Sequence, residues 1–212
     1  MCNYWKDKAH LDIRNSPESY SKARPRSIRL VSIFNELGID KNSSILEIGC
    51  NAGRNLEYLR QDGYTNLHGF DISPQAIAYS KDFFPELHTT ASIKVGEAPA
   101  CLYEYKQKFD VVFTMAVLVH ITTKDKDNIL SWVKHNTNIF IGVEPGEFAA
   151  EELERSAERY KDQGILFSGT NLHAKLIELG FDIIYHTRFK NLGSYNVTAG
   201  TRLVQSIGDK NE

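Results

Sequence analysis

The chain has 212 residues, of which 42% are hydrophobic and 25% charged, and this balance favours a globular protein with one core over a disordered or fibrous one. A formal net charge of −2 gives no general attraction for nucleic acids or anionic membranes, so we expect neither as a partner. No apolar run approaches the roughly 20 residues of a membrane span, and residues 1–6 lack the apolar core of a signal peptide, which predicts a cytoplasmic protein.

The three cysteines, Cys2, Cys50 and Cys101, are widely spaced and odd in number. This pattern favours reduced thiols over a disulfide framework or a zinc site. We therefore expect no metal in this protein, and we assign no catalytic role to Cys50.

The first 24 residues are rich in charged and aromatic side chains but have no clean period. They predict an irregular arm with room for a short helix. Pro25 can stand at the first position of a helix, and apolar side chains then recur on one face until Gly38. Residues 25–38 therefore predict a helix that covers the rest of the fold.

From residue 43 onward, short apolar runs alternate with helical patterns. The expected strands are residues 43–49, 66–71, 91–96, 109–114 and 138–143, and the expected helices are residues 56–63, 73–84 and 124–135. Ser73 is a favourable N-cap, with Pro74 at the first helical position. This alternation is typical of the doubly wound α/β class, a mostly parallel sheet with helices on both faces.

The C-terminal third departs from strict alternation. Residues 148–161 carry many glutamates at helical spacing and predict an inserted helix, either a solvated face or a lid over a ligand site. A helix that ends at Gly180 is followed by two expected antiparallel strands, residues 181–189 and 200–206, joined by a hairpin loop at residues 190–199.

These elements predict a seven-stranded sheet in a single domain spanning residues 1–212. Its parts are the arm and covering helix at 1–38, a core at 43–145, the insertion at 146–169, and a C-terminal helix and hairpin at 170–208. A monomer or a homodimer is expected.

The loop after the first core strand, Glu47 to Gly53, lies where ligands bind in open α/β sheets, beyond the carboxyl ends of the strands. Gly49 and Gly53 allow sharp turns, and Asn51 tolerates the left-handed conformation better than most residues. A dinucleotide fingerprint would place glycines at 49, 51 and 54, but Asn51 and Arg54 occupy two of these positions. A nicotinamide enzyme is therefore disfavoured.

The loop resembles the first motif of the class I S-adenosylmethionine-dependent methyltransferases, with Asn51 in place of the middle glycine. Three further segments, residues 68–73, 95–98 and 112–121, resemble the second, third and fourth motifs in the same order. The resemblance implies S-adenosylmethionine as cofactor and residues 43–145 as its binding core. The implied cofactor-binding residues are Glu47, Gly49, Cys50, Asn51, Gly53, Asn55, Asp71, Ile72, Glu97, Ala98 and Met115.

Within this resemblance, Asp71 would accept hydrogen bonds from both ribose hydroxyls, because one carboxylate can accept two charge-assisted bonds. Ile72 would pack on the adenine face, Glu97 and Ala98 would contact adenine, and Met115 would lie against the methionine moiety. The alternative for Asp71 is a structural role at the start of the helix that Ser73 caps.

The segments Glu47 to Leu56 and Val117 to Ile121 are also similar to methylases associated with pseudaminic acid and other surface glycans. This similarity implies a surface-polysaccharide or capsule pathway, and O-methylation of a sugar or of a phosphorylated or nucleotide-activated precursor. His120 is either a packed histidine or the base that removes the acceptor proton. N-methylation of an amino sugar or amine, and a catalytically silent partner subunit, are the alternatives.

Candidate contacts to the small-molecule acceptor come from the arm and from the end of a later strand. In related methyltransferases an N-terminal arm often covers the cofactor, and arginines there would suit an anionic acceptor. The same side chains could instead only anchor the arm. The candidates are Tyr4, Trp5, Arg14, Tyr20, Arg24 and Glu144.

Overall fold

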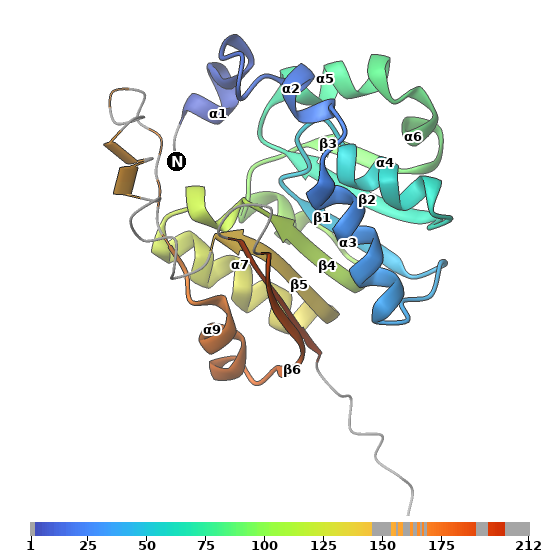
Figure 1. Ribbon diagram of the computed structural model, residues 1–212, viewed down its shortest axis with the longest axis vertical. Coiled ribbons are helices and arrows are strands. Elements are labelled where there is room, and N and C mark those ends of the chain that lie inside the picture. Colours follow the sequence, from blue (N-terminus) through green and yellow to red (C-terminus); the bar gives the residue numbers. More distant parts are fainter. Residues whose placement is uncertain are drawn as a thin grey trace, which may run out of the picture.

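The computed structural model describes residues 3–145, 169–189 and 195–201, together with residues 154, 155, 157, 158, 162, 165 and 167. Seven strands form one sheet in the order β3-β2-β1-β4-β5-β7-β6 (Figure 1). The first five pair in parallel and the last two join antiparallel, which confirms the predicted fold class. The strands are β1 Ser44–Ile48, β2 Asn66–Asp71, β3 Ser92–Val95, β4 Phe109–Met115, β5 Thr137–Pro145, β6 Asp182–Phe189 and β7 Tyr195–Thr201.

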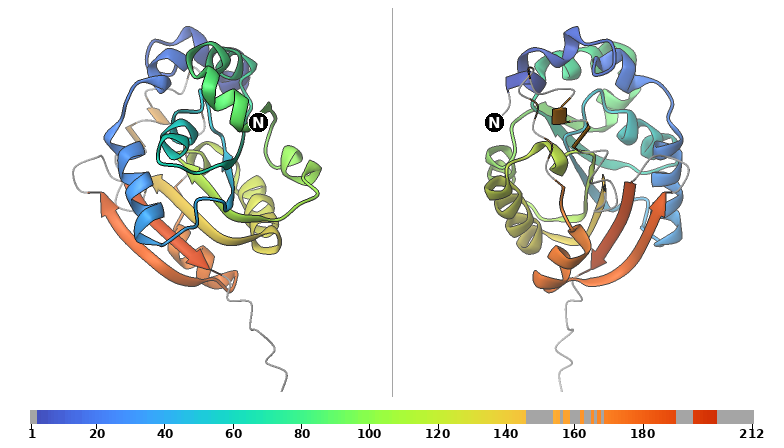
Figure 2. Two further views of the ribbon diagram at one scale, coloured as in Figure 1. Left: turned by 90° about the vertical axis from the view of Figure 1, so that its right-hand side faces the viewer. Right: turned by 60° about the vertical axis from the view of Figure 1, so that its left-hand side comes forward.

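Helices cover both faces of the sheet, and α3 and α7 lie on opposite sides of it (Figure 2). One layer contains α3 Pro25–Glu36, α4 Arg54–Gln61, α5 Pro74–Phe83 and α6 Pro85–Thr90, and the other contains η2 Ala100–Glu104, α7 Thr123–Asn136 and α9 Leu172–Glu178. Because side chains alternate along a strand, Ile45 packs into the first layer and Leu46 into the second. Both are fully buried, so β1 is a central strand.

Local signals in the sequence set several helix starts. The Ser73 hydroxyl accepts a hydrogen bond from the Ala76 N–H at 3.2 Å, and Pro74 takes the first position of α5, as predicted. Pro25 likewise begins α3. The strand β2 has the bounds predicted from the sequence, Asn66–Asp71.

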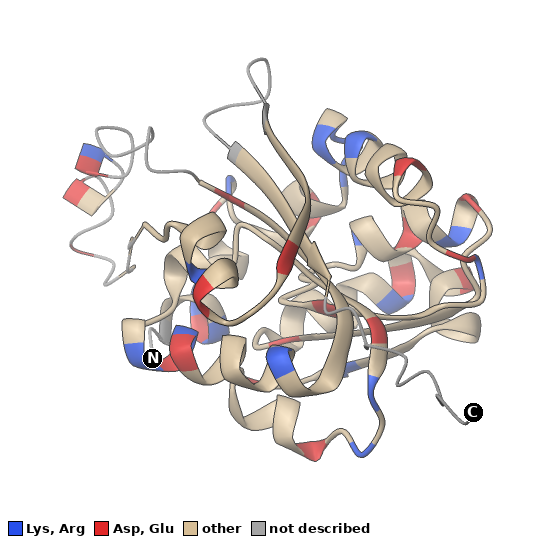
Figure 3. Cartoon of the chain, turned by 90° about the horizontal axis from the view of Figure 1, so that it is seen from below, with Lys and Arg blue, Asp and Glu red and all other residues tan. Residues whose placement is uncertain are grey.

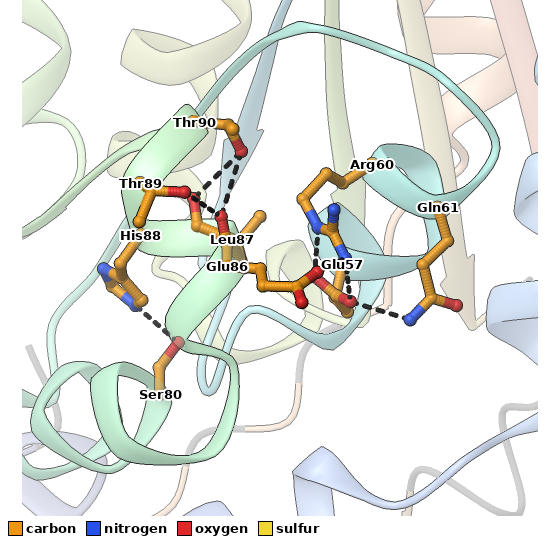
Figure 4. A network of polar contacts seen from close by, with 9 residues as sticks. All are labelled: Glu57, Arg60, Gln61, Ser80, Glu86, Leu87, His88, Thr89 and Thr90. Carbon is orange, nitrogen blue, oxygen red and sulfur yellow. Dashed lines mark hydrogen bonds and ion pairs between the residues drawn. The ribbon is translucent and has the colours of Figure 1, made fainter.

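Helix α6, which the sequence did not predict, is fastened to its neighbours by polar contacts (Figure 4). The Arg60 guanidinium bonds Glu57 at 2.8 and 2.9 Å on its own helix and Glu86 at 2.8 Å on α6. The Ser80 hydroxyl lies 2.9 Å from the His88 Nε2. These contacts hold α6 beside α4 and α5.

The last strand differs from the prediction. β7 is Tyr195–Thr201, so residues 195–199 are strand rather than hairpin loop, and residues 202–206 of the expected strand lie outside the described residues. Val197 and Ala199 are fully buried and pair with Val143 and Ile141 of β5. The alternate positions of β7 carry polar and small residues, so the sequence has no apolar run there. The strands that pair with β7 are distant in sequence, and the pattern becomes clear only beside them.

The N-terminal arm is more regular than the sequence suggested. It forms α1 Asn3–Asp7, η1 Ala9–Leu11 and α2 Pro17–Ser21, and α2 packs on α5 (Figure 1). The Tyr4 hydroxyl donates to the Asp12 carboxylate and accepts from the Asn15 amide, both at 2.9 Å. The Ser21 hydroxyl lies 3.3 Å from the Tyr79 hydroxyl on α5. The arm therefore has its own polar anchors.

The predicted insertion at residues 146–169 falls mostly outside the described residues. Residues 154, 155, 157 and 158 are helical. Within the described ranges, no helix has the length and apolar character needed to cross a bilayer. Basic and acidic positions are intermixed over the face drawn in Figure 3.

Candidate functional site

A cleft of about 760 Å³, its open mouth included, lies at the carboxyl ends of β1, β2 and β4. The chain connects β1 to β2 on one side and places β4 on the other, so the cleft lies at the point where the strand order reverses. Trp5 and Tyr20 of the arm close its outer side.

The loop after β1 is held in an unusual backbone conformation. Gly49, Asn51 and Gly53 have φ angles of +72°, +46° and +77°. A Cβ added to Gly49 would lie 2.6 Å from a methyl carbon of Val117, so a side chain there would collide as well as strain the backbone. The Asn51 side-chain oxygen accepts from the Ala52 N–H at 2.8 Å, which stabilises the left-handed residue.

Asp71, at the end of β2, ties that strand to the β1 loop. Its carboxylate accepts from the Asn51 N–H at 2.8 Å and from the Ser73 N–H at 2.9 Å, and it lines the cleft. Burial raises the pKa of Asp71, and the bonds from Ser73 and Asn51 oppose that rise. The structural and the ligand-binding interpretations are thus compatible, because a carboxylate has about four lone-pair sites.

Beneath the loop, four side chains form a hydrogen-bonded chain, of which Ser27, Asn55 and Glu47 are buried and Arg54 is partly buried. The Arg54 Nε donates to the Ser27 hydroxyl at 2.8 Å, Ser27 donates to the Asn55 oxygen at 2.7 Å, and the Asn55 Nδ2 donates to Glu47 Oε1 at 2.7 Å. Burial raises the pKa of Glu47 to about 8. The second oxygen of Glu47, Oε2, has no hydrogen-bond partner among the described residues.

The turn after β4 forms the opposite wall. Ala116 has a φ of +58°, which is uncommon for a residue with a side chain. Its N–H donates to the Val143 carbonyl at 2.9 Å, and the Val117 N–H donates to the Glu144 carboxylate at 3.1 Å. Glu144 is buried and is not among the residues that line the cleft, so its role among the described contacts is to support the turn.

His120 enters the cleft from η3 Leu118–His120. Its ring centroid is 4.7 Å from that of Trp5 and 4.9 Å from that of Phe167. Asp71 ends β2, and His120 lies in η3, which follows β4; β2 and β4 flank β1 on opposite sides. The arrangement places a titratable ring at one side of the cleft and a carboxylate at the other.

The structure gathers nine of the predicted site residues around the cleft: Trp5, Tyr20, Gly49, Asn51, Asp71, Ile72, Ala98, Met115 and His120. Glu47, Cys50, Gly53 and Asn55 are buried behind it. The Glu97 side chain is not among the lining residues, and its carbonyl accepts from the Cys101 N–H at 2.8 Å. Cys50 and Cys101 are free thiols.

The predicted acceptor contacts in the arm also fall into two groups, those that line the cleft and those that do not. Tyr4 is buried and anchors the arm, while Arg14 and Arg24 are exposed and do not line the cleft. Sequence reasoning missed the lining residues Ile48, Phe70, Gly96, Ala116, Val117 and Ile121. All six lie inside the motif segments that the sequence predicted, but apolar residues at strand ends give no signal that marks them individually as lining residues.

The order of the strands, the glycine-containing loop and the acidic end of β2 define a domain with the class I methyltransferase fold. Residues 45–138 match the family model of the methyltransferase domain. Among curated proteins, the chain is similar to 2-methyl-6-phytyl-1,4-hydroquinone methyltransferase of Synechocystis, with 26% identity over 125 residues. That match covers 57% of this chain and 39% of the relative, so the chain matches about two fifths of that protein's length.

Solved structures share the fold. Magnesium protoporphyrin IX methyltransferase from Synechocystis PCC 6803, crystallised with bound S-adenosylhomocysteine, superposes with a TM-score of 0.73 at 15% identity, covering 95% of this chain and 97% of that one. An O-methyltransferase family protein from Burkholderia thailandensis superposes with a TM-score of 0.70 at 11% identity, covering 94% and 63%. At these identities the similarity extends to the fold.

Proposed function

We propose that this protein is an S-adenosylmethionine-dependent methyltransferase that methylates an oxygen of a small metabolite. The observation that carries the proposal is the cleft at the strand-order reversal, with the Asp71 carboxylate on one side and His120 on the other. The match of residues 45–138 to the methyltransferase domain supports it.

The residues present fit this cofactor. Asp71 keeps lone pairs free for a ribose diol after accepting its two backbone bonds, and Phe70, Ile72 and Ala98 offer apolar surface for a base. When bound, the cofactor supplies a methyl group on a positively charged sulfur. The protein would mainly align the acceptor with that methyl and exclude water, and His120 would accept the proton of a hydroxyl acceptor.

The finer proposal, a sugar or a phosphorylated or nucleotide-activated precursor of a surface polysaccharide, is supported by the sequence similarity of the loop alone. Among the described residues that line the cleft there is no lysine or arginine. The geometry therefore supports a hydroxyl acceptor. It gives no support to a phosphate group, which would need a cation in the lining.

Asp71→Asn tests cofactor binding. Because bonds to a charged group contribute about 1.5–3 kcal/mol, we expect the variant to bind S-adenosylhomocysteine roughly tenfold to a hundredfold more weakly in calorimetry. Asp82→Asn, an exposed position on α5, is the matched control and should bind normally. Equal affinity of the two variants would contradict the cofactor site.

His120→Asn tests the acceptor atom. With a hydroxyl acceptor, loss of a positioned base should lower kcat by about 10²–10⁴, because the hydroxyl must lose its proton. An amine acceptor in its neutral form needs no such base, so near-normal turnover would favour N-methylation. Tight cofactor binding without turnover on any acceptor would instead favour the silent partner subunit.

A further inference from the structure

The part of the cleft around His120, where the acceptor would lie, is built from aromatic and aliphatic groups; we call it the acceptor side. Trp5, Val117 and Ile121 line it beside His120. Trp5 packs against Tyr4 with ring centroids 5.3 Å apart, and Trp5 belongs to the apolar cluster of the arm. Aromatic walls of this kind gain most from a flat ring that packs against them.

The cationic groups nearby are engaged elsewhere. Arg54 bonds the Tyr20 carbonyl at 2.6 Å and the Ser27 hydroxyl at 2.8 Å. The buried Lys126 ammonium donates to the Thr170 hydroxyl at 2.8 Å, and it does not line the cleft. An anionic acceptor would thus lose its hydration without gaining a cation from the described lining, which is costly.

One polar group at this side has no partner. The Trp5 indole N–H is buried and finds no hydrogen-bond acceptor among the described residues. A buried donor without a partner is rare in folded proteins and destabilising, so it calls for an explanation. Because Trp5 lines the cleft, a bound molecule is one source of the missing acceptor atom.

We infer that the acceptor is an uncharged aromatic compound with a hydroxyl group and a second oxygen, a class that catechol represents. The ring packs against Ile121 and the edge of Trp5 that carries the N–H, the second oxygen accepts that N–H, and the hydroxyl faces His120. This inference rests on the proposed methyltransferase function and names its substrate class.

The transfer balances with the groups named. The hydroxyl proton passes to a ring nitrogen of His120, and the oxygen lone pair forms the new bond to the methyl carbon. The bond between that carbon and sulfur breaks, with its electron pair remaining on sulfur to give S-adenosylhomocysteine. No further reactant is needed.

The test uses the two tryptophans of the chain, Trp5 and Trp132. In protein labelled at the indole nitrogens, Trp132→Phe leaves one indole N–H signal, which reports Trp5. With saturating S-adenosylhomocysteine present, catechol should shift this signal downfield, whereas glucose 1-phosphate and methyl glucoside should not. A shift with either sugar, or none with catechol, would overturn the inference.

Affinity gives the second measurement. Trp5→Phe keeps an aromatic ring but removes the N–H, so we expect catechol to bind about threefold to tenfold more weakly than to wild type. Trp132→Phe, in the core on α7, should bind catechol normally. If S-adenosylhomocysteine binds and glucose 1-phosphate is methylated in preference to catechol, this inference fails while the proposed function stands. If S-adenosylhomocysteine does not bind, the proposed function itself fails.

Discussion

At the scale of single residues, Glu47 combines a structural role with an energetic cost. Its side chain is 1% exposed and accepts one hydrogen bond, from Asn55, while its other oxygen has no described partner. Burial disfavours the charged form and raises the pKa of Glu47 from 4.5 to about 8. A carboxyl in this state stays protonated in the folded protein near neutral pH.

This pKa predicts the direction of a pH effect. Below pH 4.5 both the folded and the unfolded state hold the proton, so the ionisation of Glu47 does not affect the free energy of unfolding. As the pH rises from 4.5 to about 8, the unfolded state loses the proton that the folded state keeps, and stability falls. Above the folded pKa the loss is complete and constant.

Glu47→Gln should remove this dependence, because glutamine keeps the oxygen that Asn55 bonds but does not ionise. In cofactor-free protein we expect nearly equal melting temperatures at pH 4.5 and a gain of roughly 6–20 °C at pH 8.5, because about 3–5 kcal/mol shifts the midpoint of a chain of this size by about 2–4 °C per kcal/mol. Thermal unfolding across that range is the measurement. Glu18→Gln, an exposed control, should follow wild type; a gain for it too would contradict the argument.

At the scale of elements, the sequence located most of the parallel core, because each strand there is a short apolar run bounded by turn residues. It identified β2 and the starts of α3 and α5 from local signals alone. It missed α6 and misplaced β7. The polar face of β7 carries Asn196 and Thr198, and its alternation becomes meaningful only when β5 lies beside it.

Val197→Ala tests the position of β7. Val197 is fully buried in the cluster that contains Phe34 and Val143, so its truncation should lower the free energy of unfolding by about 1.5–3 kcal/mol. A residue in a hairpin loop would show almost no effect. Denaturant unfolding is the measurement, and Ile184→Ala on β6, which is 41% exposed, should cost less than about 1 kcal/mol.

At the scale of the whole molecule, the arm, the covering helix and the β1 loop meet at one guanidinium. Arg54 is the first residue of α4, and it bonds the Tyr20 carbonyl of the arm and the Ser27 hydroxyl of α3. Through Ser27 and Asn55 the same chain reaches Glu47 on β1. The outer wall of the cleft is thus connected to its floor.

Arg54→Lys should break this connection, since one ammonium cannot reproduce two bonds that diverge from a planar guanidinium. We expect S-adenosylhomocysteine to bind about fivefold to fiftyfold more weakly. Calorimetry measures the affinity, and hydrogen exchange at residues 17–21 should be faster. Arg60→Lys on the same helix alters only the contacts with Glu57 and Glu86 and should bind normally; equal losses in both variants would refute the connection.

The sequence by itself determined the class of fold, the loop from Glu47 to Gly53 and the acidic end of β2, because these depend on residues close together in the chain. Only the tertiary structure decided that Val117 closes over Gly49, that the rings of Trp5 and His120 meet at a tilt, and that Glu97 does not line the cleft. The physical reason is that the wall of a site forms where distant segments pack. Local propensity and periodicity carry no information on which segments those are.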